Sequence, residues 1–244
     1  MMQRDIHLKP RDLLNSFQFR DGDFGEIGIV SGQPQRVKLC LERLNKPVKN
    51  FSFLGYTFWT GEYKGKKITV GNGGMYSPDA GFITELLCEG KIEYLIRIGS
   101  CGSLREDIDI GSLIIPQFAL RGEGTTSYYV DKDFIPRATS SLVEKLFSIS
   151  KEYLPTFTGG VWTTDALLRE TKEIVNSYIE KGAIAVDMVT SAFFTIANIY
   201  KKNVCAILAV SDNLITGRLG FNDFKFFESQ QKMTNIVFKL IENI

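Results

Sequence analysis

Hydrophobic and polar positions along the chain follow two alternating spacings, one typical of buried strands and one typical of helices. Short apolar runs bounded by glycine, proline or charged residues predict strands at residues 26–31, 94–98, 113–115, 183–186 and 204–210. Apolar residues at helical spacing predict helices at residues 35–44, 78–89, 139–153 and 171–181, from about residue 190, and at 221–244. β-Branched and aromatic residues on both sides of Lys64-Gly65 predict a hairpin.

This alternation of strands and helices favours a sheet that is covered by helices on both faces. We therefore predict an α/β fold in which residues 1–244 form a single domain. Three α/β/α layers would surround a central mixed, largely parallel sheet. Because ligands bind beyond the carboxyl ends of strands in such folds, the polar residues at these ends are the candidates for chemistry. They are residues 32–36, 99–102, 187–188 and 211–212.

Composition narrows the classes of function. The chain has 29 Lys and Arg against 28 Asp and Glu, a balance that argues against nucleic acid or an anionic membrane as its main partner. The polar opening residues predict no signal peptide, and no apolar run is long enough to predict a transmembrane helix. We therefore expect a cytoplasmic protein with reduced cysteines. With one histidine and scattered cysteines, the sequence also predicts no metal site.

The segment Arg97-Ile98-Gly99-Ser100-Cys101-Gly102 (RIGSCG) is the most informative of the candidates. An arginine inside an apolar strand is costly to bury unless its charge is matched. A Gly/Ser turn directly after it could cradle a tetrahedral anion, which the guanidinium would bind with two hydrogen bonds. An arginine paired with an internal carboxylate, beside an ordinary tight turn, explains the same residues equally well.

Two further strand ends carry weaker signals. Residues 31–36 (SGQPQR) form a strand-to-helix junction where free N–H groups, the helix dipole and Arg36 would favour an anion, although a Gly-Pro turn before a surface arginine is a common alternative. Ser211-Asp212 follows the last apolar strand. A partly desolvated carboxyl there could serve as a general acid, but an isolated aspartate is more often a helix cap.

Together these segments resemble the hexameric purine nucleoside and uridine phosphorylase family. GQPQR is similar to that family's GDPxR phosphate turn, and RIGSCGSL to its second phosphate segment. AVDMV resembles its Glu-Met-Glu ribose segment, VSDN its Ser-Asp base-binding end, and GEYKGKKITVGNGGM its hairpin and glycine-rich turn. The order and spacing of these segments agree over almost the whole chain, from His7 to the terminal helix.

The resemblance implies roles for individual residues. The residues that would hold phosphate are Gly32, Arg36, Arg97, Gly99 and Ser100. The residues that would contact the nucleoside are His7 (across a subunit interface), Cys101, Gly102, Asp187, Met188, Val189 and Ser211. Asp212 would protonate, or hydrogen-bond to, N7 of a departing purine. Inorganic phosphate would be the co-substrate, with no other cofactor.

The sequence departs from the family pattern at four positions. Gln33 replaces an aspartate of the phosphate turn, and Leu54 stands where a neighbouring subunit normally lends a third phosphate arginine. Gly74 falls where a ribose-contacting methionine often lies. Val189 stands where a glutamate normally binds the ribose 2′- and 3′-hydroxyls, which leaves Asp187 as the nearby carboxylate.

The sequence therefore predicts a purine nucleoside phosphorylase that releases the free base and a (deoxy)ribose 1-phosphate. A uridine phosphorylase, a hydrolytic nucleosidase of the same fold and a non-catalytic nucleoside-binding homologue are the alternatives. Asp212 favours a purine, and residues 164–173 hold no counterparts of the Gln and Arg that uridine phosphorylases use on uracil. By the same resemblance we expect a homo-oligomer, either a hexamer built as a trimer of dimers or a dimer.

Overall fold

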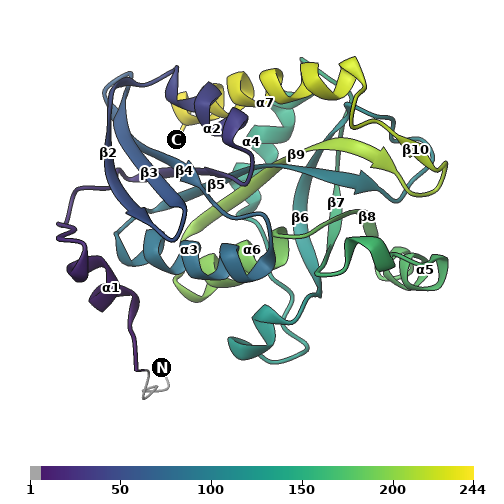
Figure 1. The fold of residues 1–244 in the computed structure, drawn as a ribbon. Coiled ribbons are helices and arrows are strands. Elements are labelled where there is room, and N and C mark those ends of the chain that lie inside the picture. The colour runs from purple at the N-terminus through teal and green to yellow at the C-terminus, as the bar shows by residue number, and fades with distance from the viewer. Residues whose placement is uncertain (1–6) are drawn as a thin grey trace.

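The computed structural model describes residues 7–244 and shows a mixed β-sheet between two groups of helices (Figure 1). The strands are β1 (Ile27–Ser31), β2 (Asn45–Phe53), β3 (Tyr56–Tyr63), β4 (Lys66–Asn72), β5 (Tyr94–Ser103), β6 (Leu113–Gly122), β7 (Thr156–Thr164), β8 (Ala183–Asp187), β9 (Asn203–Asn213) and β10 (Arg218–Leu219). The α-helices are α1 (Pro10–Ser16), α2 (Pro34–Leu41), α3 (Ser77–Glu89), α4 (Ser140–Ser150), α5 (Lys172–Ile179), α6 (Thr190–Ile199) and α7 (Phe224–Glu242).

The helices cover both faces of the sheet, as predicted. Helices α2, α4 and α7 lie on one face, and α3 and α6 pack together on the other (Figure 1). Among the described residues, no helix is both long and apolar enough to cross a bilayer. The α/β class and the mixed sheet are therefore confirmed.

Strand pairing shows that part of the sheet closes on itself. The strand order is β10-β9-β6-β7-β8-β5-β1-β4-β3-β2, and β9 also pairs with β5. The five strands β9, β6, β7, β8 and β5 therefore form a closed ring, while β1, β4, β3 and β2 extend from it. Strands β1, β5 and β9 run parallel to one another, so their carboxyl ends meet at one edge.

Three strands were not predicted, namely β2, β7 and the two-residue strand β10. β2 is an edge strand with mostly exposed side chains, so its sequence NKPVKNFSF lacks an apolar run. β7 contains the pair Gly159-Gly160, which interrupts the pattern of its sequence TFTGGVWTT. β7 is held by pairing with β6 and β8, which are distant in the sequence, and such pairing leaves no local period. β2 pairs with β3, the next strand along the chain, in a hairpin.

The centre of the core is the apolar run of β9. Residues from Val204 to Val210 are fully buried, because β9 has paired neighbours on both sides and helices α6 and α7 pack against it. Strands buried on both faces are expected to be continuously apolar, as this run is.

Replacing Leu208 of β9 by alanine should therefore destabilise the fold strongly. Leu208 is 0% exposed, and removing its side chain would leave a cavity at the ring, so we expect Leu208→Ala to lower the free energy of unfolding by about 2–5 kcal/mol. Urea denaturation followed by circular dichroism would measure this change. Leu168→Ala, at a leucine that is 92% exposed, is the matched control and should change stability little.

Candidate active site

A cavity lies at the edge where β1, β5, β8 and β9 end. It is lined by all of the predicted site residues except His7, namely Gly32, Arg36, Arg97, Gly99, Ser100, Cys101, Gly102, Asp187, Met188, Val189, Ser211 and Asp212. It is also lined by Gln33, Gly74, Met75, Leu167, Glu170, Val186 and Phe221. Segments that are more than 170 residues apart in the sequence thus meet at the strand ends, as the fold class predicts.

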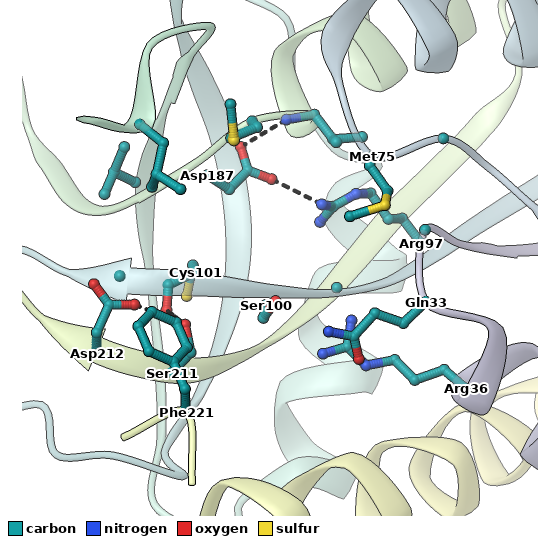
Figure 2. A pocket seen from close by; sticks show the side chains of 18 of the residues that line it. Gln33, Arg36, Met75, Arg97, Ser100, Cys101, Asp187, Ser211, Asp212 and Phe221 are labelled. Atoms are coloured by element: carbon teal, nitrogen blue, oxygen red, sulfur yellow. Dashed lines mark hydrogen bonds and ion pairs between the residues drawn. The ribbon is translucent and has the colours of Figure 1, made fainter. Parts of the chain in front are cut away.

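The cavity has two distinct ends. Figure 2 shows Arg36 and Arg97 on one side, and Ser211, Asp212 and Phe221 on the other. The first end is cationic, and the second end combines an aromatic ring with a carboxyl group. We refer to them below as the arginine end and the carboxyl end.

Arg36 at the arginine end is buried without a counter-charge. It lies in the first turn of α2, is 2% exposed, and its Nε donates a hydrogen bond to Oε1 of Gln230 in α7 (3.2 Å). Its Nη2 is buried and has no hydrogen-bond partner among the described residues. Burial and the charge of Arg97 lower the pKa of Arg36 to about 9, which still leaves it protonated at neutral pH. The alternative of an ordinary surface arginine is wrong.

Arg97, in contrast, has a carboxylate partner. Its Nη2 lies 3.1 Å from Oδ2 of Asp187, and its Nη1 donates to Oγ1 of Thr190 (3.4 Å). The internal ion pair that was one alternative for this arginine is therefore present, and the same side chain also lines the cavity. Its contact with an anion stays a prediction. Its guanidinium lies against the backbone of β5, where a Cβ on Gly99 would come within 2.1 Å of Nη1, so this position requires glycine.

The oxygens of Asp187 are occupied by partners within the protein. Besides Arg97, they accept hydrogen bonds from the hydroxyls of Thr163 (2.8 Å) and Thr190 (2.6 Å). They also accept from the backbone N–H groups of Val189 and Thr190 at the start of α6. The oxygens of Asp187 therefore offer no free acceptor for the nucleoside contact that was predicted. The carboxylate instead holds Arg97 in place.

The arginine end carries a net positive charge. Two guanidinium groups face one carboxylate, and the second guanidinium, Arg36, is desolvated and unpaired. A buried cation without a partner is unfavourable, and an anion that enters the cavity would supply the missing charge and hydrogen-bond acceptors. This arrangement suits a small oxyanion such as phosphate.

At the carboxyl end, Asp212 lies within β9 and pairs with Leu219 of β10. No helix begins at Asp212, so the alternative of a helix cap is wrong. Burial raises the pKa of Asp212, and the hydrogen bond from Ser211 Oγ to its Oδ1 (2.7 Å) lowers it in part. A raised pKa increases the protonated fraction near neutral pH and suits a proton donor.

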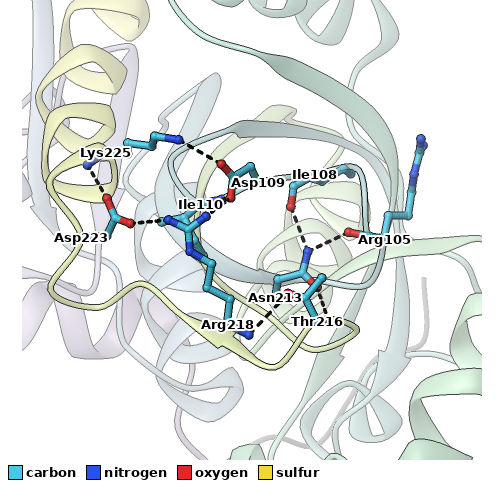
Figure 3. Close-up of polar contacts among 9 residues, drawn as sticks. All are labelled: Arg105, Ile108, Asp109, Ile110, Asn213, Thr216, Arg218, Asp223 and Lys225. Atoms are coloured by element: carbon cyan, nitrogen blue, oxygen red, sulfur yellow. Dashed lines mark hydrogen bonds and ion pairs between the residues drawn. The ribbon is translucent and has the colours of Figure 1, made fainter.

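A network of polar contacts holds the segment that follows Asp212. The side-chain amide of Asn213 donates to the carbonyl oxygens of Arg105 (2.8 Å) and Ile108 (3.0 Å). Arg218 forms ion pairs with Asp109 and Asp223, both at 2.7 Å (Figure 3). These contacts fix both ends of the loop that carries Phe221, and so they position the aromatic wall of the cavity.

Glu170 is a site residue that the sequence did not reveal. It follows the 3₁₀ turn Leu167–Arg169, and its Oε1 is buried without a hydrogen-bond partner among the described residues. Burial and the negative charge of Asp212 raise the pKa of Glu170 to about 7. Its sequence surroundings, LLRETKE, are typical of an exposed segment, so only the tertiary structure identifies this carboxyl group as part of the site.

The structure also places three other residues that the sequence analysis singled out. Gly74 has a φ of +84°, a left-handed conformation that suits glycine, and the next residue, Met75, lines the cavity instead. Leu54 is exposed in the β2–β3 turn and does not line the cavity of its own chain. His7 is also exposed and away from the cavity, so its contact with a neighbouring subunit's nucleoside stays a prediction.

Fold and site together define an α/β protein with a strand-end cavity that combines an unpaired buried arginine with a protonatable carboxyl group. Residues 26–242 match the Phosphorylase superfamily. The chain therefore belongs to this superfamily, and specifically to its nucleoside phosphorylases.

Relatives of known name agree with this assignment. The chain is 32% identical over 202 residues to the DeoD-type purine nucleoside phosphorylase of Brevibacillus brevis, covering 81% of this chain and 86% of the relative. It is also 32% identical to the DeoD-type enzyme of Caldanaerobacter subterraneus, with 81% and 87% covered.

Solved structures show the same fold. Purine nucleoside phosphorylase from Toxoplasma gondii, in complex with immucillin-H, has a TM-score of 0.83 at 22% identity and covers 100% of this chain and 98% of its own. Uridine phosphorylase from Vibrio fischeri also has a TM-score of 0.83 at 22% identity, with 92% and 95% covered. At this identity the likeness concerns the fold alone.

The two arginines should respond oppositely to replacement. Arg97→Met leaves Asp187 buried without its cation, so we expect the free energy of unfolding to fall by about 3–5 kcal/mol. Arg36→Met removes an unpaired buried charge, so stability should stay unchanged or rise. Urea denaturation in phosphate-free buffer would measure both. Added phosphate should stabilise the wild type and not Arg36→Met. Equal destabilisation by the two variants would contradict this interpretation.

Glu170 should make stability depend on pH. Its pKa is raised from 4.5 to about 7, so between these values the folded protein holds a proton that the unfolded chain has released. The free energy of unfolding therefore falls as pH rises through this window. Glu170→Gln lacks the effect and should gain stability relative to the wild type between about pH 5 and pH 8. Denaturation curves of the wild type and of Glu170→Gln at about pH 5 and about pH 8 would test this. A difference in stability between the two proteins that is the same at both pH values would contradict it.

Proposed function

We propose that this protein is a purine nucleoside phosphorylase, which cleaves the N-glycosidic bond with inorganic phosphate to give a free purine and a pentose 1-phosphate. The observation that carries the proposal is the buried guanidinium of Arg36, which has no counter-charge among the described residues and lines the cavity with Arg97. A hydrolase, which uses water, has no need of such a site. The purine nucleoside phosphorylases at 32% identity support the same reaction.

The proposed reaction needs only the groups that line the cavity. A phosphate oxygen held at the arginine end forms a bond to C1′ of the sugar while the bond between C1′ and N9 of the purine breaks. Positive charge that develops on the sugar is stabilised by the adjacent phosphate dianion. The electron pair of the broken bond passes to the base, and Asp212 donates a proton to N7 and becomes a carboxylate.

The base is proposed to be a purine because of the carboxyl end. Asp212, with its raised pKa, can donate a proton to a ring nitrogen, and Phe221 offers a flat apolar surface beside it (Figure 2). Glu170 adds a second hydrogen-bonding group on this side of the cavity. The assembly into a hexamer or dimer and a cytoplasmic location are further proposals, made by analogy with the family.

Purified protein incubated with inosine, adenosine, 2′-deoxyinosine and uridine, each with and without phosphate, tests this function by the release of free base. We expect release from the purine nucleosides that depends on phosphate. Release without phosphate would favour a nucleosidase, and preference for uridine a uridine phosphorylase. No release from any of them would favour the non-catalytic homologue.

Asp212→Asn tests the proposed role of Asp212 in the same assay. The amide keeps the size of the side chain but cannot supply the carboxylic proton, so we expect kcat/KM for purine nucleosides to fall about 100-fold or more. Binding of phosphate, measured by the stabilisation it confers, should be unaffected because Asp212 lies at the opposite end of the cavity.

A further inference from the structure

The position of the sugar in the cavity follows from the proposed reaction. C1′ is bonded to the base on one side and attacked by phosphate on the other, so the sugar must lie between the carboxyl end and the arginine end. The wall beside this position includes four apolar side chains, which are Met75, Val186, Met188 and Val189. Val189 is 3% exposed, and its side chain offers no polar group to this wall.

Of the described residues, three carboxyl groups line the cavity, and none of them is both free and beside the sugar. Glu170 and Asp212 belong to the carboxyl end, where the charge of Asp212 contributes to the raised pKa of Glu170. Asp187 lies on the sugar's wall, but its oxygens are taken by Arg97, Thr163 and Thr190.

Nor can Asp187 turn towards the sugar at low cost. The backbone that follows it is held by a hydrogen bond from Ser77 Oγ of α3 to the carbonyl oxygen of Met188 (2.9 Å). A rotation of the carboxylate would also leave the guanidinium of Arg97 buried without its partner, which is strongly unfavourable.

We propose that this site prefers 2′-deoxynucleosides to ribonucleosides, because the wall that faces the sugar is apolar and its one carboxylate is committed to Arg97. This inference rests on the proposed function for the placement of the sugar. A ribose 2′-hydroxyl placed against Met188 and Val189 would lose its hydrogen bonds to water without replacement. A 2′-deoxy sugar has hydrogen at this position and loses nothing.

The chemistry of the bond favours the same substrates. An electron-withdrawing 2′-hydroxyl destabilises the positive charge that develops on the sugar as the glycosidic bond breaks. An enzyme that binds this hydroxyl more tightly in the transition state can offset the effect. A wall whose carboxylate is committed to Arg97 offers no charged acceptor for this, so the intrinsic advantage of the deoxy sugar should be visible in the rate.

The test compares inosine with 2′-deoxyinosine, using the wild-type protein at saturating phosphate. We expect kcat/KM for 2′-deoxyinosine to exceed that for inosine by about tenfold or more, or about 1.4 kcal/mol. Phosphate-dependent cleavage that is equal for the two, or faster for inosine, would overturn the preference and leave the proposed function intact. Absence of phosphate-dependent cleavage of either substrate would overturn the proposed function instead.

Binding provides a readout that does not need turnover. Isothermal titration calorimetry with each nucleoside should show 2′-deoxyinosine binding at least as tightly as inosine. Tighter binding of inosine would overturn the inference whatever the activity.

Two variants of Val189 complete the experiment. Val189→Gln supplies a hydrogen-bonding amide on the sugar's wall without burying a charge, and it should shift the deoxy-to-ribo ratio of kcat/KM towards inosine by about tenfold. Val189→Ile keeps the wall apolar and should leave the ratio as in the wild type. Equal ratios for the two variants would show that this wall does not decide sugar preference.

Discussion

The buried ion pair between Arg97 and Asp187 is the interaction on which the site depends. It joins β5 to the end of β8, two strands of the closed ring, and its aspartate also accepts hydrogen bonds from the first residues of α6. A pair this deeply buried is stable only when both partners have good geometry and their other hydrogen bonds are satisfied. The threonine hydroxyls and backbone N–H groups around Asp187 provide this.

That pair also determines what the neighbouring arginine can do. Because Asp187 is committed to Arg97, Arg36 has no carboxylate among the described residues to neutralise it, and Gln230 satisfies only part of its guanidinium. The fold therefore keeps a desolvated positive charge at the cavity. Such a charge costs stability in the empty protein, and an anion would relieve it, so the same feature that weakens the fold would give the affinity for phosphate that the proposed function requires.

The two ends of the cavity differ in charge and in the groups that they offer to a substrate. In the proposed function, fixed positive charge would hold the nucleophile, and the carboxyl groups with raised pKa values would face the leaving group. Between them lie the apolar side chains around Val189, which offer no hydrogen bond to a sugar. The proposed preference for 2′-deoxynucleosides follows from this wall.

The sequence by itself determined the fold class and most of the site. The apolar runs at residues 94–98 and 204–210 predicted central strands, because strands buried on both faces must be continuously apolar. Polar residues directly after such runs, as in RIGSCG and VSD, marked the strand ends at which the cavity lies. This much is local, since each signal is contained within a few consecutive residues.

Only the tertiary structure decided the rest, because it depends on contacts between distant segments. The closure of the ring through the pairing of β9 with β5 and β6 leaves no trace in either strand's period. The partner of Arg97, the absence of a partner for the Nη2 of Arg36 among the described residues, and the burial of Glu170 are likewise products of packing. A residue type states which charge a side chain can carry, whereas its surroundings decide whether that charge is matched, exposed or available to a substrate.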